Sequence, residues 1–228
     1  QCTCFTPDLL GDYEIQLYIS DSFENNFTTW FLNVYNNLPN IAIDCPSTVY
    51  LNNNVSISAL NTYDVDNDPL SYQWQFISRP QGSNANLFSP NQPETGFIPD
   101  KRGTYSIKLQ VSDPYGKTEK TIDIQCINRK PQPVLIPGEI EVSHGEIVFF
   151  DASQSSDPDK DAIFYDWELF LRPVLSSAEI YLVQENIAAL KTDSPGIYSV
   201  SLQLNDGIDT SNTITAEITA INSPPIIQ

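Results

Sequence analysis

The amino-acid sequence predicts an all-β chain made of tandem two-sheet sandwiches, and three observations support this fold class. Apolar and polar residues alternate with a period of two in many short stretches, which is typical of strands with one buried face. Gly, Pro, Asn and Asp separate these stretches at the spacing of turns in a sandwich. Groups of residues also recur 92 or 93 positions apart, which indicates an internal repeat.

The clearest repeated segment is an alternation of the form Gly-x-Tyr-x-apolar-x-Leu-x-apolar-x-Asp. It begins at Gly11, Gly103 and Gly196. Three prolines follow these segments with the same period, and they are Pro39, Pro131 and Pro224. A period that is constant to within one residue at so many positions predicts copies of one structural unit.

The repeat divides the chain into four parts. We expect residues 1–37 to be the C-terminal part of one domain, 38–129 and 130–222 to be complete domains, and 223–228 to begin a further unit or linker. On this interpretation the sequence starts and stops within a longer array. Each complete domain is expected to be an immunoglobulin-like β-sandwich of about seven strands.

In the second domain, the alternation places these strands near 41–51, 55–60, 70–77, 85–88, 95–98, 104–112 and 119–127. Trp74 and Trp167 lie in equivalent alternating segments and are expected to point into the core. Residues 182–190 have some helical character, but they align with 89–97, which favours a loop and a strand.

Composition limits the classes of partner. The 228 residues include 11 basic and 29 acidic side chains, so the net charge is −18 and nucleic acid is a poor partner. No apolar run has the length of a membrane span. Four Cys, few Lys and abundant Asn, Ser, Thr and Tyr indicate an extracellular or cell-surface protein. Three interpretations of this acidity stay open: solubility, divalent-cation binding and a high-salt habitat.

Two acidic loops are the best candidates for a ligand site. Each has three Asp at alternate positions between two predicted strands, and a second acidic loop is expected at the same end of each sandwich. The candidate calcium ligands are Asp64, Asp66, Asp68 and Asp113 in one domain, and Asp151, Asp157, Asp159, Asp161 and Asp206 in the other. Calcium prefers six to eight hard oxygen ligands. The alternative is that these Asp only cap turns. If calcium binds, Asp151 and Asp209 predict tighter binding in the third domain.

These features together resemble a known family. The segment Asp151-Ala-Ser-x-Ser-x-Asp157-x-Asp159-x-Asp161, the later Tyr-x-Trp and the Gly-x-Tyr alternation resemble the PKD (polycystic kidney disease) repeat. Arg79-Pro-Gln-Gly-Ser83 is similar to its bacterial and REJ-like (receptor for egg jelly) branch. The chain departs from the repeat after Trp74 and Trp167, where Asp-Phe-Gly-Asp-Gly is absent. The resemblance implies an extracellular spacer or adhesion module without catalytic activity.

The residues contain no signature of an enzyme. The single His144 is expected in a solvated turn, and there is no Gly-x-Ser-x-Gly motif or phosphate-binding Gly-rich loop. We therefore expect a non-catalytic rod, stalk or filament element that contacts copies of itself, other surface proteins or matrix. Two alternatives stay open: accessory modules of a secreted hydrolase, and a polysaccharide- or matrix-binding module, for which Phe31 and Tyr35 are candidate outward aromatics.

Cysteines and glycosylation sequons are not part of the repeat. Four Cys permit three complete pairings, and the disulfide candidates are Cys2, Cys4, Cys45 and Cys126. A bridge between the Cys2/Cys4 pair and Cys45 is easier in this topology than one between Cys45 and Cys126. Cys126 alternatively is a buried free thiol. Asn26 and Asn54 begin N-glycosylation sequons in predicted turns.

Overall fold

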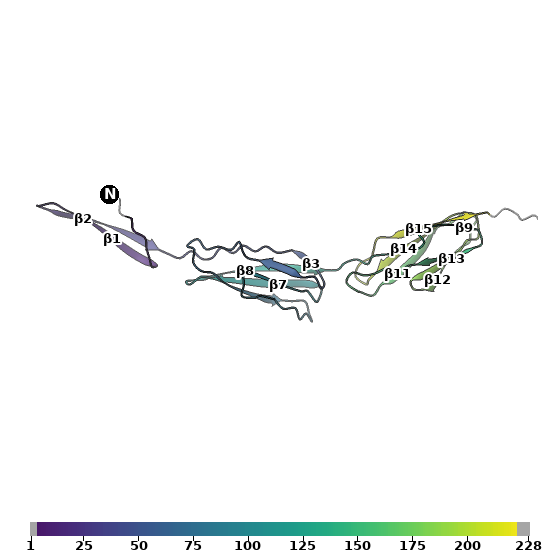
Figure 1. Cartoon of the computed structure of the whole chain (residues 1–228), viewed down its shortest axis with the longest axis horizontal. Helices are drawn as coiled ribbons and strands as arrows, with labels where there is room; N and C mark the ends of the chain where they lie inside the picture. Colours follow the sequence, from purple (N-terminus) through teal and green to yellow (C-terminus); the bar gives the residue numbers. More distant parts are fainter. Residues whose placement is uncertain (1–3, 223–228) are drawn as a thin grey trace, which may run out of the picture. The chain divides into compact units, whose positions relative to one another are not determined.

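The computed structural model describes residues 4–222 as strands joined by turns and loops (Figure 1). The chain divides into two compact units, one formed by residues 1–49 and 53–125 and the other by residues 50–52 and 126–228. Within residues 4–222 there is no helix long and apolar enough to cross a membrane. The predicted all-β class is confirmed.

The first unit contains a hairpin and a sandwich. The hairpin pairs β1 (Gly11–Ser20) with β2 (Asn25–Val34) in antiparallel register. The sandwich, called the middle sandwich below, has six strands: β3 (Thr48–Tyr50), β4 (Val55–Ser58), β5 (Ser71–Ser78), β6 (Glu94–Phe97), β7 (Gly103–Ser112) and β8 (Lys117–Ile127). One sheet has the order β3-β8-β7-β5, and the other pairs β4 with β6.

The second unit contains the C-terminal sandwich, which has seven strands: β9 (Glu139–Ser143), β10 (Ile147–Asp151), β11 (Phe164–Leu171), β12 (Ile180–Gln184), β13 (Ile187–Lys191), β14 (Gly196–Asn205) and β15 (Ile214–Ile221). Its sheets have the orders β11-β14-β15-β9 and β10-β13-β12. Strand β9 is parallel to β15, whereas the other pairs are antiparallel.

The alternating residues of the repeat form both cores. In β7, Tyr105, Ile107, Leu109 and Val111 are fully buried, while the residues between them are less buried. Tyr198, Val200, Leu202 and Leu204 are fully buried at the equivalent positions of β14. Burial of such side chains stabilises a domain by about 1.5–3 kcal/mol each. The sequence alternation therefore marks the buried face of each sandwich correctly.

The two tryptophans anchor equivalent strands to a facing loop. Trp74 is 2% exposed, and its indole N–H donates to the carbonyl of Gln92 at 3.0 Å. Trp167 is partly buried against the core, and its N–H donates to Glu185 at 3.2 Å. The prediction that these side chains point inward is confirmed for Trp74, and holds in part for Trp167.

A tyrosine hydroxyl closes a corner in every copy of the repeat, and this tyrosine is buried in the two sandwiches. The hydroxyl of Tyr105 donates to the carbonyl of Lys101 at 2.8 Å and accepts from that residue's N–H at 3.0 Å. Tyr198 makes the same pair of bonds to Ser194 at the same distances, and Tyr13 makes both to Leu9 at 2.8 Å. This tyrosine corner is a recurring device of immunoglobulin-like sandwiches.

Some strands differ from the sequence prediction. No strand forms at 85–88. This segment is followed by Pro90 and Pro93, and Pro cannot donate to a β-ladder. The strand expected at 41–51 is reduced to β3, with isolated bridges from Asn40 and Asp44 before it and Pro46 between. Residues 182–190 are strand and turn rather than helix, as the alignment with 89–97 predicted.

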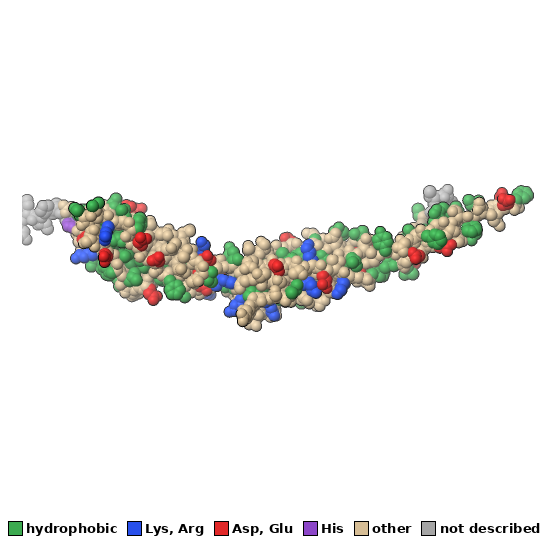
Figure 2. Space-filling view, turned by 180° about the vertical axis from the view of Figure 1, so that it is seen from behind, with side chains coloured by type: hydrophobic (Ala, Val, Ile, Leu, Met, Phe, Trp, Pro, Cys, Tyr) green, Lys and Arg blue, Asp and Glu red, His purple; other side chains and the backbone are tan. Residues whose placement is uncertain are grey.

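The hairpin exposes side chains whose counterparts are core residues in the sandwiches. Leu17 is 48% exposed and Ile19 is 65% exposed, whereas Leu109 and Val111 at the equivalent positions of β7 are fully buried. Apolar side chains are visible on the surface of the hairpin (Figure 2). The described residues provide no second sheet against this face, so the alternation of β1 and β2 leaves these side chains in solvent.

Candidate calcium sites

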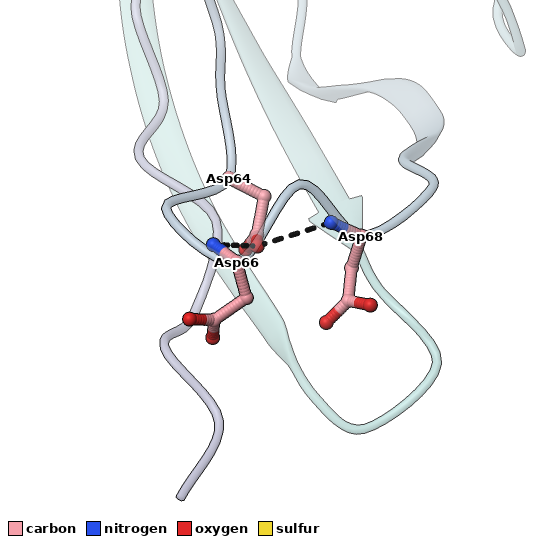
Figure 3. Close-up of side chains that lie close together, drawn as sticks. All are labelled: Asp64, Asp66 and Asp68. Carbon is pink, nitrogen blue, oxygen red and sulfur yellow. Dashed lines mark hydrogen bonds between the residues drawn. The ribbon is translucent and has the colours of Figure 1, made fainter. Parts of the chain in front are cut away.

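The loop between β4 and β5 is organised around Asp64. Its Oδ1 accepts hydrogen bonds from the backbone N–H of Asp66 at 2.8 Å and of Asp68 at 3.3 Å (Figure 3). Asn67 has a left-handed φ of 61°, which turns the chain tightly between these two residues. Asn tolerates this conformation better than most residues. The carboxylates of Asp66 and Asp68 are thereby held on one tight loop.

The loop between β10 and β11 repeats this geometry. Oδ1 of Asp157 accepts from the N–H of Asp159 at 2.7 Å and of Asp161 at 3.1 Å. Lys160 stands at the position of Asn67 and has a φ of 68°. The first Asp of each loop therefore caps a turn, as the alternative interpretation of the sequence predicted. Turn capping accounts for one oxygen of each first Asp only.

The other oxygen of each first Asp has no hydrogen-bond partner. Oδ2 of Asp64 and Oδ2 of Asp157 are shut off from solvent and unpartnered. The two residues are 7% and 9% exposed. A buried, unpaired acceptor costs about 1–3 kcal/mol, and more when it carries charge, so such atoms are rare unless an ion or water binds there. Both loops thus present the same unsatisfied anionic oxygen.

Further carboxylates lie close to each of these two residues. Asp64, Asp66 and Asp68 have carboxylate oxygens within 4.8 Å of one another, and so do Asp157, Asp161 and Asp206. Two oxygens bound to one Ca²⁺ at about 2.4 Å each lie at most about 4.8 Å apart. Each group could therefore coordinate a single ion without rearrangement of the backbone.

The facing loops, which join the last two strands, complete the negative charge. In the C-terminal sandwich, Asp206 belongs to the cluster itself and is 8% exposed. In the middle sandwich, burial raises the pKa of Asp68, and the carboxylates of Asp64, Asp113 and Asp66 raise it further. Asp113 is thus close enough to repel the cluster. The C-terminal sandwich thus brings its two predicted acidic loops into one cluster, whereas Asp113 lies beside the cluster of the middle sandwich and is not one of its three members.

Two linker residues contact each acidic region. The Asn36 amide Nδ2 donates to Asp113 at 3.0 Å, and this hydrogen bond is the largest cause that lowers the pKa of Asp113. Asn128, 92 positions later, donates to Asp206 at 2.8 Å and to Asp209 at 3.0 Å. The sequence analysis did not single out these asparagines, although their period and their position before Pro39 and Pro131 could have identified them.

The next linker residue differs between the two sites. Asn37 donates its backbone N–H to Asp66 at 2.7 Å and its amide to the same carboxylate at 3.0 Å. Arg129 takes this position in the C-terminal sandwich and forms an ion pair with Asp159, with Nε at 2.7 Å and Nη2 at 2.6 Å from Oδ1. One carboxylate predicted as a calcium ligand is therefore neutralised by a side chain.

Two other residues that the sequence analysis considered are Asp151 and His144. Asp151 ends β10, and its carboxylate accepts from the N–H of Ser153 at 2.7 Å. Hydrogen bonds from the side chain and from the backbone N–H of Ser153 lower the pKa of Asp151. Asp151 thus makes a local turn contact rather than joining the cluster of Asp157, Asp161 and Asp206. His144 is exposed in the turn between β9 and β10, as expected.

The glycosylation sites and disulfides stay predictions. Asn54 is exposed in the loop before β4, but Asn26 is the second residue of β2 rather than part of a turn. Cys4 and Cys45 are free thiols, Cys126 is buried in the core of the middle sandwich, and Cys2 lies outside the described residues. Burial raises the pKa of the Cys45 thiol, and Asp44 raises it further. Disulfide pairing therefore stays open.

Comparison with known proteins agrees with this architecture. The family model of the PKD domain matches residues 40–126. A mouse protein described as "Dyslexia-associated protein KIAA0319-like protein" is 27% identical over 167 residues, which cover 68% of this chain and 16% of the relative. The chain thus spans about a sixth of that relative's length.

Several solved structures match parts of this chain at low identity and with TM-scores below 0.5. Human protocadherin-24 EC1-2 is 17% identical and covers 83% of this chain and 100% of its own, with a TM-score of 0.35. The immunoglobulin domains 1-5 of Sidekick-1 are 15% identical and cover 94% of this chain and 46% of theirs, with a TM-score of 0.38. The PKD domain of the KIAA 1837 protein is 17% identical and covers 36% and 83%, with a TM-score of 0.29.

The family match covers the middle sandwich. It agrees there with the resemblance to the PKD repeat that the sequence suggested. The family match and the repeated sandwich agree with a structural or adhesion module.

Proposed function

We propose that this chain is a segment of a non-catalytic, extracellular repeat array that acts as a structural element at a cell surface, and that calcium stabilises its sandwiches. The observation that carries the calcium assignment is the buried, unpartnered Oδ2 of Asp64, which recurs at Asp157. Repetition of an unsatisfied anion at equivalent positions supports one shared ligand. Calcium suits the site, because the clustered side chains are all carboxylates.

Thermal unfolding in millimolar calcium and in chelator tests this proposal. An ion that binds only the folded state at 100 times its Kd stabilises it by about 2.7 kcal/mol per site. We expect the midpoint to rise by several degrees for each sandwich, with about one calcium bound per sandwich by metal analysis. The matched control is the double variant Asp64→Asn and Asp157→Asn. It keeps an acceptor oxygen for the turn and should lose the calcium effect. Equal midpoints of the unchanged chain with and without calcium would contradict the proposal.

The array role follows from the repeat and its short linkers, 36–40 and 128–132. Repeats that contact only their neighbours through short linkers form elongated objects, so we propose a rod, stalk or filament element. Small-angle scattering in calcium should give a maximum dimension close to the summed lengths of the folded parts. A compact particle with both sandwiches folded would contradict this role and leave the calcium sites unaffected.

A further inference from the structure

Asn36 and Asn128 hold equivalent places in the two sandwiches. Each lies in the linker before its sandwich and donates its amide nitrogen to the Asp that begins the facing loop, Asp113 or Asp206. Asp206 is itself one of the three residues of its cluster. The side-chain amide of the linker therefore lies at the edge of each proposed ion site.

The amide oxygen of each asparagine has no partner. Oδ1 of Asn36 and Oδ1 of Asn128 are both buried from solvent without a hydrogen bond. They are thus unsatisfied in the same way as Oδ2 of Asp64 and Oδ2 of Asp157. Each of the two sites thus contains two unpartnered buried side-chain atoms. An ion accounts for both kinds of atom, because amide carbonyls are regular calcium ligands.

We infer that the linker asparagines Asn36 and Asn128 each supply an oxygen ligand to the calcium ion of the sandwich that follows. In the ion-free state, the amide N–H of Asn128 lies between the carboxylates of Asp206 and Asp209, where it reduces their mutual repulsion. The ion takes over this role, and Oδ1 reaches it directly or after a half-turn of the amide. Three carboxylates and one amide then leave two to four positions for water or for second carboxylate oxygens.

This arrangement makes the linker part of the site. An ion that binds both the acidic loops and Asn128 fixes the first residue after β8 to the C-terminal sandwich, and Asn36 does the same for the middle sandwich. Calcium would then order each linker as well as stabilise its domain. The inference rests on the proposed calcium function, so its test must separate the two.

The test uses two single-site proteins. Asp64→Asn leaves only the C-terminal site, and Asp157→Asn leaves only the middle site. Asn128→Ala or Asn36→Ala is then added, with Asn54→Ala as a control at an exposed asparagine outside both sites. Calcium affinity is measured by calorimetry, and terbium luminescence lifetimes in H₂O and D₂O count the waters on the bound ion.

Loss of the ligand should weaken calcium binding about tenfold and add one water to bound terbium, whereas Asn54→Ala should change neither. Asn128→Asp separates a ligand from a hydrogen-bond donor. It supplies an oxygen but no N–H, so it should bind calcium more tightly than Asn128→Ala. Unchanged affinity and hydration in the Ala variants, or weaker binding by Asn128→Asp than by Asn128→Ala, would overturn this inference alone. Absence of calcium binding in both single-site parents and in the unchanged chain would overturn the proposed function with it.

Discussion

The middle and C-terminal sandwiches make the same stabilising contacts with equivalent residues. Both place a tyrosine hydroxyl on the backbone of a corner, both build an acidic turn on the first Asp, and both draw the linker asparagine onto the facing loop. These contacts recur 92 or 93 positions apart, although many residues around them differ. What is repeated is thus a set of buried polar contacts as well as an apolar pattern.

The sandwiches differ at a few positions that border these shared contacts. Arg129 replaces Asn37 beside the acidic loop, and Ser177 replaces Asn84 beside the tyrosine corner. Each change alters charge or hydrogen bonding at a carboxylate without changing the backbone turn around it. We infer that the shared residues maintain the fold, whereas these neighbours adjust how strongly each sandwich responds to ions and acid.

The largest effect should come from removing a shared contact. Tyr105→Phe and Tyr198→Phe each remove hydrogen bonds from partly buried corner N–H and C=O groups, which should destabilise the sandwich by about 1–2 kcal/mol. The two losses should be nearly equal, because the distances match. Urea unfolding of the two variants measures both values.

Tyr13→Phe provides the matched control, because the hairpin makes the same corner in solvent. Water replaces lost hydrogen bonds there, so the change should be small. A cost for Tyr198→Phe that is much smaller than that for Tyr105→Phe would show that the corner is not the shared stabilising element.

The sequence alone predicted well the apolar pattern that the two sandwiches share. The Gly-x-Tyr alternation marked the buried face of β7 and β14, because strand burial follows a local period of two. It failed where prolines next to an apolar segment outweigh the alternation. Residues 85–88 have an apolar pattern but form no strand, whereas the equivalent segment forms β12, which lacks proline.

The candidate sites were predictable in part for the same reason. Alternate Asp residues identified the two loops, and domain topology paired them with Asp113 and Asp206. The contact between Arg129 and Asp159 depends on the path of the linker, which no local pattern gives. The prediction that the C-terminal site binds calcium more tightly stays open. Asp209 favours it, and the positive charge of Arg129 opposes it.

Exchange of the linker residues should produce the next largest effect. Arg129→Asn removes a positive charge beside the C-terminal cluster, so calcium should bind there about fivefold more tightly, equivalent to about 1 kcal/mol. Asn37→Arg should weaken binding to the middle cluster by a similar factor. Calorimetry on the single-site proteins measures both changes.

High salt provides the control for this exchange. A Coulomb effect at a partly exposed site decreases as ionic strength rises, so both differences should shrink in about 0.5 M salt. Tighter binding after Asn37→Arg would show that the side chain acts through geometry rather than charge.

The smallest expected effect concerns acid stability at the tyrosine corner. Burial raises the pKa of Asp100, but hydrogen bonds from Ser83, Asn84 and Tyr105 lower it overall. For its counterpart Asp193, the hydrogen bond from Ser176 is the largest cause of a pKa well below the ordinary range, and Ser177 and Tyr198 add to it. The extra donor is the Ser177 hydroxyl, at 3.0 Å from Oδ2.

A carboxylate whose pKa is lowered by folding stabilises the folded state above the pKa of the unfolded chain, about 3.9 for Asp. This contribution is lost as the pH falls through the folded pKa. The stabilisation by Asp193 should therefore persist to a lower pH than the stabilisation by Asp100.

Ser177→Ala removes the extra donor and should raise the acid-unfolding midpoint of the C-terminal sandwich by a few tenths of a pH unit. Tryptophan fluorescence follows the transition, and Asn84→Ser should lower the midpoint of the middle sandwich. If neither midpoint moves, the corner carboxylates do not set the acid limit, and the calcium-free acidic loops become the groups to test.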